Sequence, residues 1–135
     1  MADFHLSVVA PDKSVVEEEV RSVVAPGSEG YFGVLAGHVP FVFALKPGLL
    51  EYRDHAGNQH FVYIGGGFAE VQPTKVTVLA DEAQNAREID LSEAERMLES
   101  ARAALRGESS STQSEAALVE IERATHRIRA ARTAR

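Results

Sequence analysis

The sequence lacks cysteine and tryptophan, and its aromatic residues are limited to six phenylalanines and three tyrosines. The absence of cysteine excludes disulfides, thiolate metal sites and cysteine nucleophiles. No apolar run approaches the roughly 20 residues that a membrane-spanning helix needs, and no secretory signal is recognisable, so we expect a cytoplasmic protein. The net charge of −6 argues against nucleic-acid binding, because such binding needs positive charge to displace counterions.

The 135 residues are 44% hydrophobic and 25% charged, which is typical of a small globular protein with a core of its own. The character of the chain changes near residue 80. Every aromatic residue lies at or before Phe68, and every proline lies at or before Pro73. After Ala80 there are twelve alanines and a single glycine, Gly107. We therefore expect two parts, a β-rich domain over residues 1–84 and a helical segment over residues 85–135.

In the first part, turn-forming residues recur about every ten positions, as in all-β sandwiches and barrels. Phe4, Leu6 and Val8 alternate with polar residues, which is typical of a half-buried strand. Residues 49–53 and 59–64 flank a turn and indicate a hairpin, and residues 76–79 indicate a final strand. The pattern predicts an antiparallel β-sandwich of about eight to ten short strands.

In the second part, apolar residues recur at spacings of three and four and predict two helices, about 91–106 and 113–132. Asp90 and Glu93 can cap the first helix, and residues 107–111 interrupt the pattern. The apolar stripes are narrow and rich in alanine; the second includes Ala117, Leu118 and Ile128. Such a two-helix antiparallel hairpin buries little area, so we expect it to be able to detach from the rest of the chain.

The sequence contains neither a P-loop nor a Gly-x-Ser-x-Gly nucleophile turn, and the glycines at 65–67 suit a bulge or a close approach of the backbone. His55 and His60 flank a turn and could meet, but no third metal ligand lies nearby in the sequence, so we expect no metal site. The run of acidic residues 17–19 suits a strand edge that resists aggregation. Nothing indicates an enzyme that acts alone.

Arg123 and Arg127 lie four residues apart and share a helix face. Arginines at this spacing suit phosphate or carboxylate groups, because a guanidinium can bind two oxygens. Alternatively, they are cations at a solvated helix end, where they complement the helix dipole. The spacing alone leaves both interpretations open.

Three segments together resemble the epsilon subunit of the bacterial F-type ATP synthase. They are LSVVAPDKSV (6–15), PGSEGYFGVLAGHVP (26–40) and YIGGGFAEVQPTKVTVLAD (63–81). They occur in family order and spacing and are followed by two helical segments. The resemblance extends over essentially the whole chain and is weakest between Met97 and Thr112.

The resemblance implies a non-catalytic subunit of the central stalk, or rotor, which couples rotation of the c-subunit ring to ATP synthesis. The sandwich would contact the gamma subunit and the c ring. Ser28, Glu29, Gly30 and Tyr31 match the loop that faces the c ring, and His38 lies in a turn that we assign to the gamma interface. The family also implies a peripheral location at the cytoplasmic face of the bacterial inner membrane, without insertion into the membrane.

In the family, the helical hairpin regulates the complex. When extended, it obstructs ATP hydrolysis, and its C-terminal helix contacts the catalytic alpha and beta subunits. Some members also bind ATP on the folded hairpin. The positions that match this ATP site are Ile89, Asp90, Ala94, Arg123 and Arg127. Glu93 replaces the arginine of the motif and Gln84 replaces a glutamate, so regulatory ATP would bind weakly, and no cofactor is required.

Two other classes of function are compatible with the residues alone. The first is a free-standing β-sandwich interaction module that uses its helices to recruit a different partner. The second is a small hydrolase that uses His55 and His60. The first would show no affinity for a gamma subunit, and the second requires the two histidines to come together.

Overall fold

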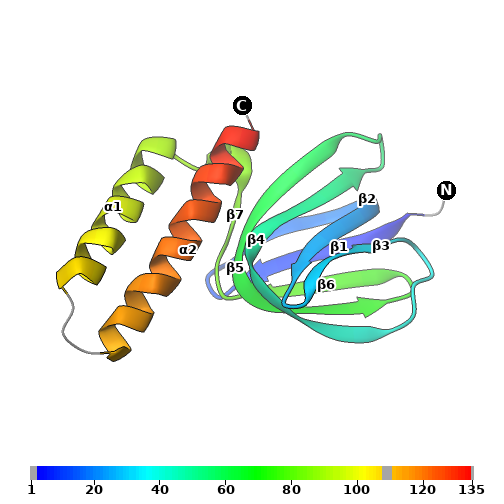
Figure 1. Ribbon diagram of the computed structural model, residues 1–135. Helices are drawn as coiled ribbons and strands as arrows, with labels where there is room; N and C mark the ends of the chain where they lie inside the picture. The colour runs from blue at the N-terminus through cyan, green and yellow to red at the C-terminus, as the bar shows by residue number, and fades with distance from the viewer. Residues whose placement is uncertain (1–2, 108–110, 135) are drawn as a thin grey trace.

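The structure is a computed structural model that describes residues 3–107 and 111–134. It consists of a β-sheet part followed by two helices that lie side by side (Figure 1). This arrangement confirms the predicted class of fold, a β-sandwich followed by a helical hairpin.

The described residues form seven strands, one short 3-10 turn and two helices. The strands are β1 (Phe4–Ala10), β2 (Lys13–Gly27), β3 (Gly30–Val34), β4 (Phe41–Asp54), β5 (Gln59–Gln72), β6 (Lys75–Ala80) and β7 (Ala83–Asn85). The 3-10 turn η1 covers Ala86–Glu88, and the helices are α1 (Leu91–Gly107) and α2 (Ser111–Thr133).

The strands are fewer and longer than the eight to ten short ones predicted from the spacing of turn residues. Pro47 and Gly65 pair with each other inside the β4–β5 ladder, so neither residue ends a strand. The register of β2 against β4 shifts between Val24 and Gly27, where a proline and a glycine lie in the strand. At the β2–β4 shift, such a bulge lets the strand bend while pairing continues on both sides of it.

The strands close into a ring in the order β1-β6-β5-β4-β2, and β2 then pairs with β1. Two strands lie outside this ring: β3 pairs with β2, and β7 pairs with β5. The pairing of β1 with β6 is parallel, which corrects the expectation of a purely antiparallel sheet. Closure gives each strand of the ring two neighbours and leaves few unpaired edges.

The main core lies inside this ring. Phe4, Leu6 and Val8 are at most 2% exposed, which confirms the alternating strand predicted at the N-terminus. Val20, Leu50, Val62, Ile64, Val71 and Val76 complete its centre. Burial of this apolar area is the main stabilising contribution to the sheet part.

The glycines at 65–67 lie where neighbouring segments come close to β5, and the register of β4 against β5 continues through them without a bulge. Gly66 and Gly67 have φ values of +104° and +133°. A Cβ atom on Gly67 would lie 2.2 Å from the carbonyl oxygen of Leu79. Only glycine therefore fits at position 67, because a side chain there would meet both a strained backbone and a neighbouring strand.

The two helices pack on each other, and α2 lies against the sheet part, where it contacts β4, β5 and η1 (Figure 1). Helix α1 begins at a cap in which Asp90 Oδ1 accepts the Glu93 N–H at 3.1 Å. A second apolar cluster joins the sheet to α2 and the start of α1 through Leu49, Tyr63, Ala86, Ile89, Ala94, Ile128, Ala130 and Ala131. The hairpin is thus in its folded-down position.

The buried stripe of α2 differs from the prediction at Leu118 and at Thr125, a predicted stripe residue that is exposed. Ala117 and Ile128 are buried as expected, but Leu118 is 53% exposed. Ala124 and Ala131, each 1% exposed, continue the buried face instead. Small side chains occupy this face because the helix lies close to its neighbours. The predicted break at residues 107–111 falls partly on 108–110, which lie outside the described residues.

Candidate functional site

The seam between α2 and the sheet is organised by the carboxylate of Glu82, which lies between β6 and β7. Its Oε1 accepts hydrogen bonds from Arg127 Nη2 and from the Tyr63 hydroxyl. Arg123 Nε lies 4.0 Å from the same oxygen. We call Tyr63, Glu82, Arg123 and Arg127 the Glu82 cluster. It joins β5 and the segment between β6 and β7 to two successive turns of α2 through one carboxylate oxygen.

The Glu82 cluster is largely withdrawn from water. Arg127 is 8% exposed, and its guanidinium carbon lies 5.0 Å from the centroid of the Tyr63 ring. Burial, and then the hydrogen bond to Glu82, raises the pKa of Tyr63 above its ordinary value. Arg127 Nη1 is buried and has no hydrogen-bond partner among the described residues. The charge of Arg127 therefore depends on Glu82, because a buried cation is costly unless it is paired.

A pocket of about 270 Å³ lies beside this cluster, at the start of α1. It is lined by Gln84, Glu88, Ile89, Asp90, Glu93, Ala94, Met97 and Arg127. Four of the five predicted nucleotide-site residues, Ile89, Asp90, Ala94 and Arg127, thus come together. Arg123 lines a different pocket, between α2 and the sheet, together with Asp81 and Glu122. The two arginines face one carboxylate but do not share one cavity.

The electrostatics of the pocket are unfavourable for phosphate. Glu88, Asp90 and Glu93 contribute three carboxylates to its lining, and Arg127 is its only lysine or arginine. Arg127 is already bound by Glu82. A polyphosphate would have to displace Glu82 and approach three like charges, which weakens binding. Ile89 and Ala94, at 4% and 1% exposed, serve mainly to pack α1 against the sheet.

The predicted c-ring segment is an exposed turn between β2 and β3. Gly27 pairs with Gly30, whose φ of +132° suits glycine, and Ser28 N–H donates to the Ala44 carbonyl at 2.9 Å. Ser28, Glu29 and Gly30 are exposed. Tyr31 is 47% exposed, and its hydroxyl accepts the Leu49 N–H at 3.2 Å. The turn is therefore fixed at its base, while its tip is accessible.

His38 lies in a separate turn that leads into β4. Gly37 N–H donates to the Pro73 carbonyl at 2.8 Å, with a φ of +82° at Gly37. His38 Nδ1 lies 3.0 Å from the Val39 carbonyl oxygen, and its ring centroid is 4.9 Å from that of Phe41. His38 is half-buried by these neighbours. The contacts give it a packing role within its own turn.

An exposed apolar row crosses β4, β5 and β6, and sequence reasoning did not single it out. Ala44 pairs with Phe68, and Phe68 pairs with Leu79, so the three residues form one cross-strand row. Phe68 is 57% exposed and Leu79 is 59% exposed; Val42, two residues before Ala44, is 64% exposed. Alternation marks two faces on each strand but does not say which face a partner covers. The only sign of this exposed row in the sequence is that β4, β5 and β6 carry apolar residues on both faces.

The histidines do not form the pair that the hydrolase alternative requires. His55 Nδ1 pairs with Asp3 Oδ2, whereas His60 Nε2 lies 2.8 Å from Asp54 Oδ2. Two members of the acidic run at 17–19 serve specific contacts: Glu17 accepts from Ser7, and Glu18 accepts from the Tyr52 hydroxyl at 3.1 Å. These residues therefore bind side chains of neighbouring strands in addition to any effect on the strand edge.

Comparison with known proteins places these features in a family context. Residues 3–86 match the family model described as "ATP synthase, Delta/Epsilon chain, beta-sandwich domain". The chain is 55% identical over 86 residues to an ATP synthase epsilon chain of Desulforapulum autotrophicum, which covers 64% of each protein. It is 52% identical over 96 residues to one of Desulfatibacillum aliphaticivorans, which covers 71% of this chain and 68% of that relative. The chain thus spans slightly less than two thirds of the first relative.

Two solved structures share the fold. A chain of the Euglena gracilis mitochondrial ATP synthase (OSCP/F1/c-ring) has a TM-score of 0.80 and 30% identity, over 93% of this chain and 79% of that one. A chain of the Tetrahymena thermophila mitochondrial ATP synthase (central stalk/c-ring) has a TM-score of 0.69 and 12% identity, over 96% and 97%, which shows the fold alone. Among the described residues, neither helix has the length and apolar character that crossing a membrane requires.

Proposed function

This chain belongs to the ATP synthase epsilon chain family, and from that premise we propose that it is a non-catalytic subunit of the central stalk of an F-type ATP synthase. In this role it couples rotation of the c ring to ATP synthesis. One observation carries most weight: the fold matches a chain of an F1/c-ring assembly over 93% of its length, which extends beyond the sandwich into the hairpin. It would lie peripherally at the cytoplasmic face of the bacterial inner membrane.

The proposed contacts with partners use two surfaces of the sheet part. The exposed turn of Ser28, Glu29, Gly30 and Tyr31 would meet the polar loops of the c ring, where the carboxylate can accept hydrogen bonds. The exposed row of Phe68 and Leu79, together with the His38 turn, would meet the gamma subunit. The apolar row supports this assignment, because contiguous exposed apolar area often marks a protein interface.

The hairpin is proposed to inhibit ATP hydrolysis when it extends. In the folded-down position it is held by the Glu82 cluster and by a small, alanine-rich apolar cluster. Few contacts must therefore break for release, as a two-state element requires. Arg129 and Arg132, which are exposed on α2, could then engage acidic surfaces of the alpha and beta subunits.

Two experiments test these proposals separately. Pull-down with the full chain from source membranes should recover the gamma subunit; failure to recover it would favour a free-standing interaction module.

Deletion of residues 90–135 within the assembled complex should raise ATP hydrolysis relative to the complex with the full chain. Unchanged hydrolysis would reject the inhibitory role while leaving the stalk assignment intact.

We further propose that regulatory ATP, which is not required as a cofactor, binds weakly in the pocket of Ile89, Asp90, Ala94 and Arg127. An ATP titration of the full chain followed by NMR should shift these residues only in the millimolar range. Glu82→Gln should strengthen binding, since it releases Arg127. Tight binding to the unmodified chain, or shifts confined to other residues, would contradict the proposal.

A further inference from the structure

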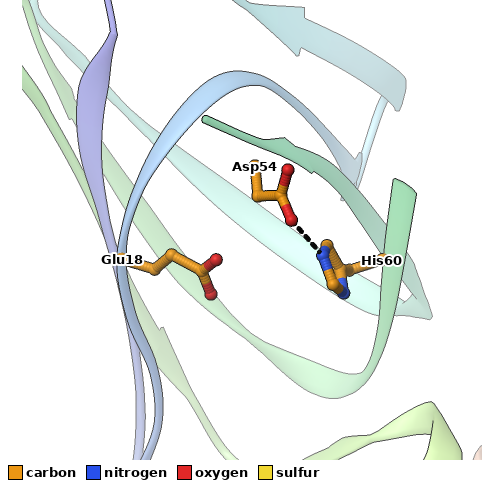
Figure 2. A group of neighbouring side chains, drawn as sticks. All are labelled: Glu18, Asp54 and His60. Atoms are coloured by element: carbon orange, nitrogen blue, oxygen red, sulfur yellow. Dashed lines mark hydrogen bonds and ion pairs between the residues drawn. The ribbon is translucent and has the colours of Figure 1, made fainter. Parts of the chain in front are cut away.

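Three side chains from three strands converge at one end of the sheet part, separate from the Glu82 cluster. Glu18 comes from β2, Asp54 from the end of β4, and His60 from the start of β5 (Figure 2). One potential ligand atom from each residue lies within 4.8 Å of the other two. His60 Nε2 and Asp54 Oδ2 are 2.8 Å apart, and the Glu18 carboxylate faces this pair (Figure 2).

Other groups hold each of these three side chains in place. The Tyr52 hydroxyl donates to Glu18 Oε2 at 3.1 Å, and the Tyr52 ring stacks on the His60 ring with centroids 4.8 Å apart. The Asn58 N–H donates to Asp54 Oδ1 at 2.9 Å, which leaves Oδ2 toward His60. Such outer contacts orient ligands in protein metal sites, and here they fix the directions of an imidazole and two carboxylates.

The donor set defines the chemistry that this cluster would accept. All three residues are partly buried, and the side chains of Asp54 and His60 are 16% and 24% exposed. The two carboxylates place two negative charges in a small space, which a divalent cation would neutralise. An imidazole among the ligands favours zinc-like ions over Mg²⁺ or Ca²⁺, which prefer oxygen ligands alone. Three protein ligands would leave further positions for water.

We propose that Glu18, Asp54 and His60 form a binding site for one divalent transition-metal ion of the Zn²⁺ class. This proposal differs from the sequence-based expectation of no metal site, because the third candidate ligand, Glu18, is distant in the sequence. Zinc–ligand distances of about 2.1 Å place ligand atoms about 3.4 Å apart, so Glu18 must move toward the pair by roughly an ångström. The hydrogen-bonded atoms of His60 and Asp54 must separate slightly, and the proton between them must leave to solvent when zinc binds. The bound ion would tie β2, β4 and β5 together at this end of the sheet.

Another histidine in the same sheet provides a matched control. His5 also lies near two carboxylates, but Glu17 approaches its Nε2 at 2.8 Å and Glu19 approaches its Nδ1 at 3.3 Å. The two carboxylates therefore flank different nitrogens of the ring. This arrangement forms two separate pairs, whereas the geometry at His60 gathers three ligand atoms around one point.

Titration of the full chain with ZnCl₂ in a chelator-free buffer, followed by calorimetry, tests the proposal. We expect saturable binding of one equivalent and a higher melting temperature with zinc. His60→Ala should weaken binding at least about tenfold and abolish the rise in melting temperature, whereas His5→Ala should leave both unchanged. MgCl₂ should give no saturable binding.

Because His60→Ala also removes the ring that stacks on Tyr52, Glu18→Gln serves as a second variant. Glutamine keeps the shape and can still accept the Tyr52 hydroxyl, so this variant should fold normally, as checked by circular dichroism, and bind zinc about tenfold more weakly. Three results would each overturn the proposal. They are a lack of saturable zinc binding by the unmodified chain, zinc binding by His60→Ala and Glu18→Gln that is as tight as that of the unmodified chain, and Mg²⁺ binding that is as strong as zinc binding.

Discussion

Individual residues show how strongly this molecule depends on a few charged groups. One oxygen of Glu82 receives hydrogen bonds from both Tyr63 and Arg127, and it faces Arg123 as well. The arginine pair that the sequence suggests for phosphate is thus paired internally with carboxylates of the same chain, Glu82 and, for Arg123, also Glu120. In the folded-down hairpin, the arginines act first as anchors of α2.

Replacement of Glu82 by glutamine should reduce the free energy of unfolding by about 1–3 kcal/mol. The substitution keeps the size of the side chain but leaves the charge of Arg127, which is 8% exposed, without a counter-ion. Urea denaturation followed by circular dichroism measures the change. Glu120→Gln is the control, because Glu120 also pairs with Arg123 but is exposed, and it should change stability by no more than about 0.5 kcal/mol. Equal stability of the two variants would show that the Glu82 cluster does not anchor α2.

At the scale of elements, α2 is the component that decides where the hairpin lies. It contacts β4, β5 and η1, whereas α1 packs mainly on α2. The apolar part of its contact with the sheet consists largely of alanines and Ile128, so polar groups contribute substantially to docking. His126 on α2 is half-buried, and within residues 3–107 and 111–134 its buried Nδ1 has no hydrogen-bond partner.

Docking of α2 should weaken in mild acid because of His126. Burial lowers its pKa below the usual 6.5, and the charges of Arg129 and Lys46 lower it further, although Glu122 acts in the opposite direction. The neutral form therefore contributes stability above about pH 6.5 that is lost as the pH falls through the lowered pKa. Amide hydrogen exchange of α2, corrected for the intrinsic effect of pH, should show less protection at pH 5.5 than at pH 7.

A variant separates this effect from other titrations. His126→Ala should flatten the pH dependence of α2 protection, whereas His55→Ala, at a side chain that is 83% exposed, should not. Overall unfolding is a poorer measure, because contacts with Glu17 and Glu19 raise the pKa of His5. Because its pKa is raised in the folded state, His5 stabilises the protein at low pH, and this stabilisation is lost as the pH rises. His126 has the opposite effect, so the two contributions partly cancel in overall unfolding. An unchanged pH profile in His126→Ala would reject the assignment.

The whole molecule contains two apolar clusters, of which the larger belongs to the sheet part alone and the smaller is shared between the sheet and the helices. The larger cluster is built entirely from residues between Phe4 and Ala83, inside the closed ring of strands. The smaller one combines Leu49 and Tyr63 of the sheet with residues of η1, α1 and α2. The sheet part therefore has a core of its own, whereas the hairpin obtains part of its apolar packing from the sheet.

A fragment that ends at residue 86 should fold by itself, and one that begins at residue 87 should not. The first retains the larger cluster and should unfold cooperatively in urea with a β-type circular dichroism spectrum. The second contains two helices of 17 and 23 residues without the sheet surface, and such helices are marginal in water. The full chain is the reference for both measurements. A non-cooperative first fragment would mean that the hairpin and the sheet form one unit of stability.

The sequence by itself determined the two-part architecture, the first strand and the cap of α1. These features depend on local properties: the alternation of Phe4, Leu6 and Val8, the change to alanine after residue 80, and the reach of Asp90 to the next helical turn. Short-range patterns of this kind act before any distant contact forms. The family segments likewise lie within continuous stretches of chain.

Only the tertiary structure decided the length of the strands, the parallel pairing of β1 with β6, and the partners of the charged side chains. The local sequence at Pro47 predicts a turn, but in the closed ring Pro47 is paired within the β4–β5 ladder. Arg127 meets Glu82 across 45 positions. Glu18 meets Asp54 and His60 because β2, β4 and β5 bring them together. Strand register and closure set these encounters, and both arise from the packing of distant segments rather than from local preference.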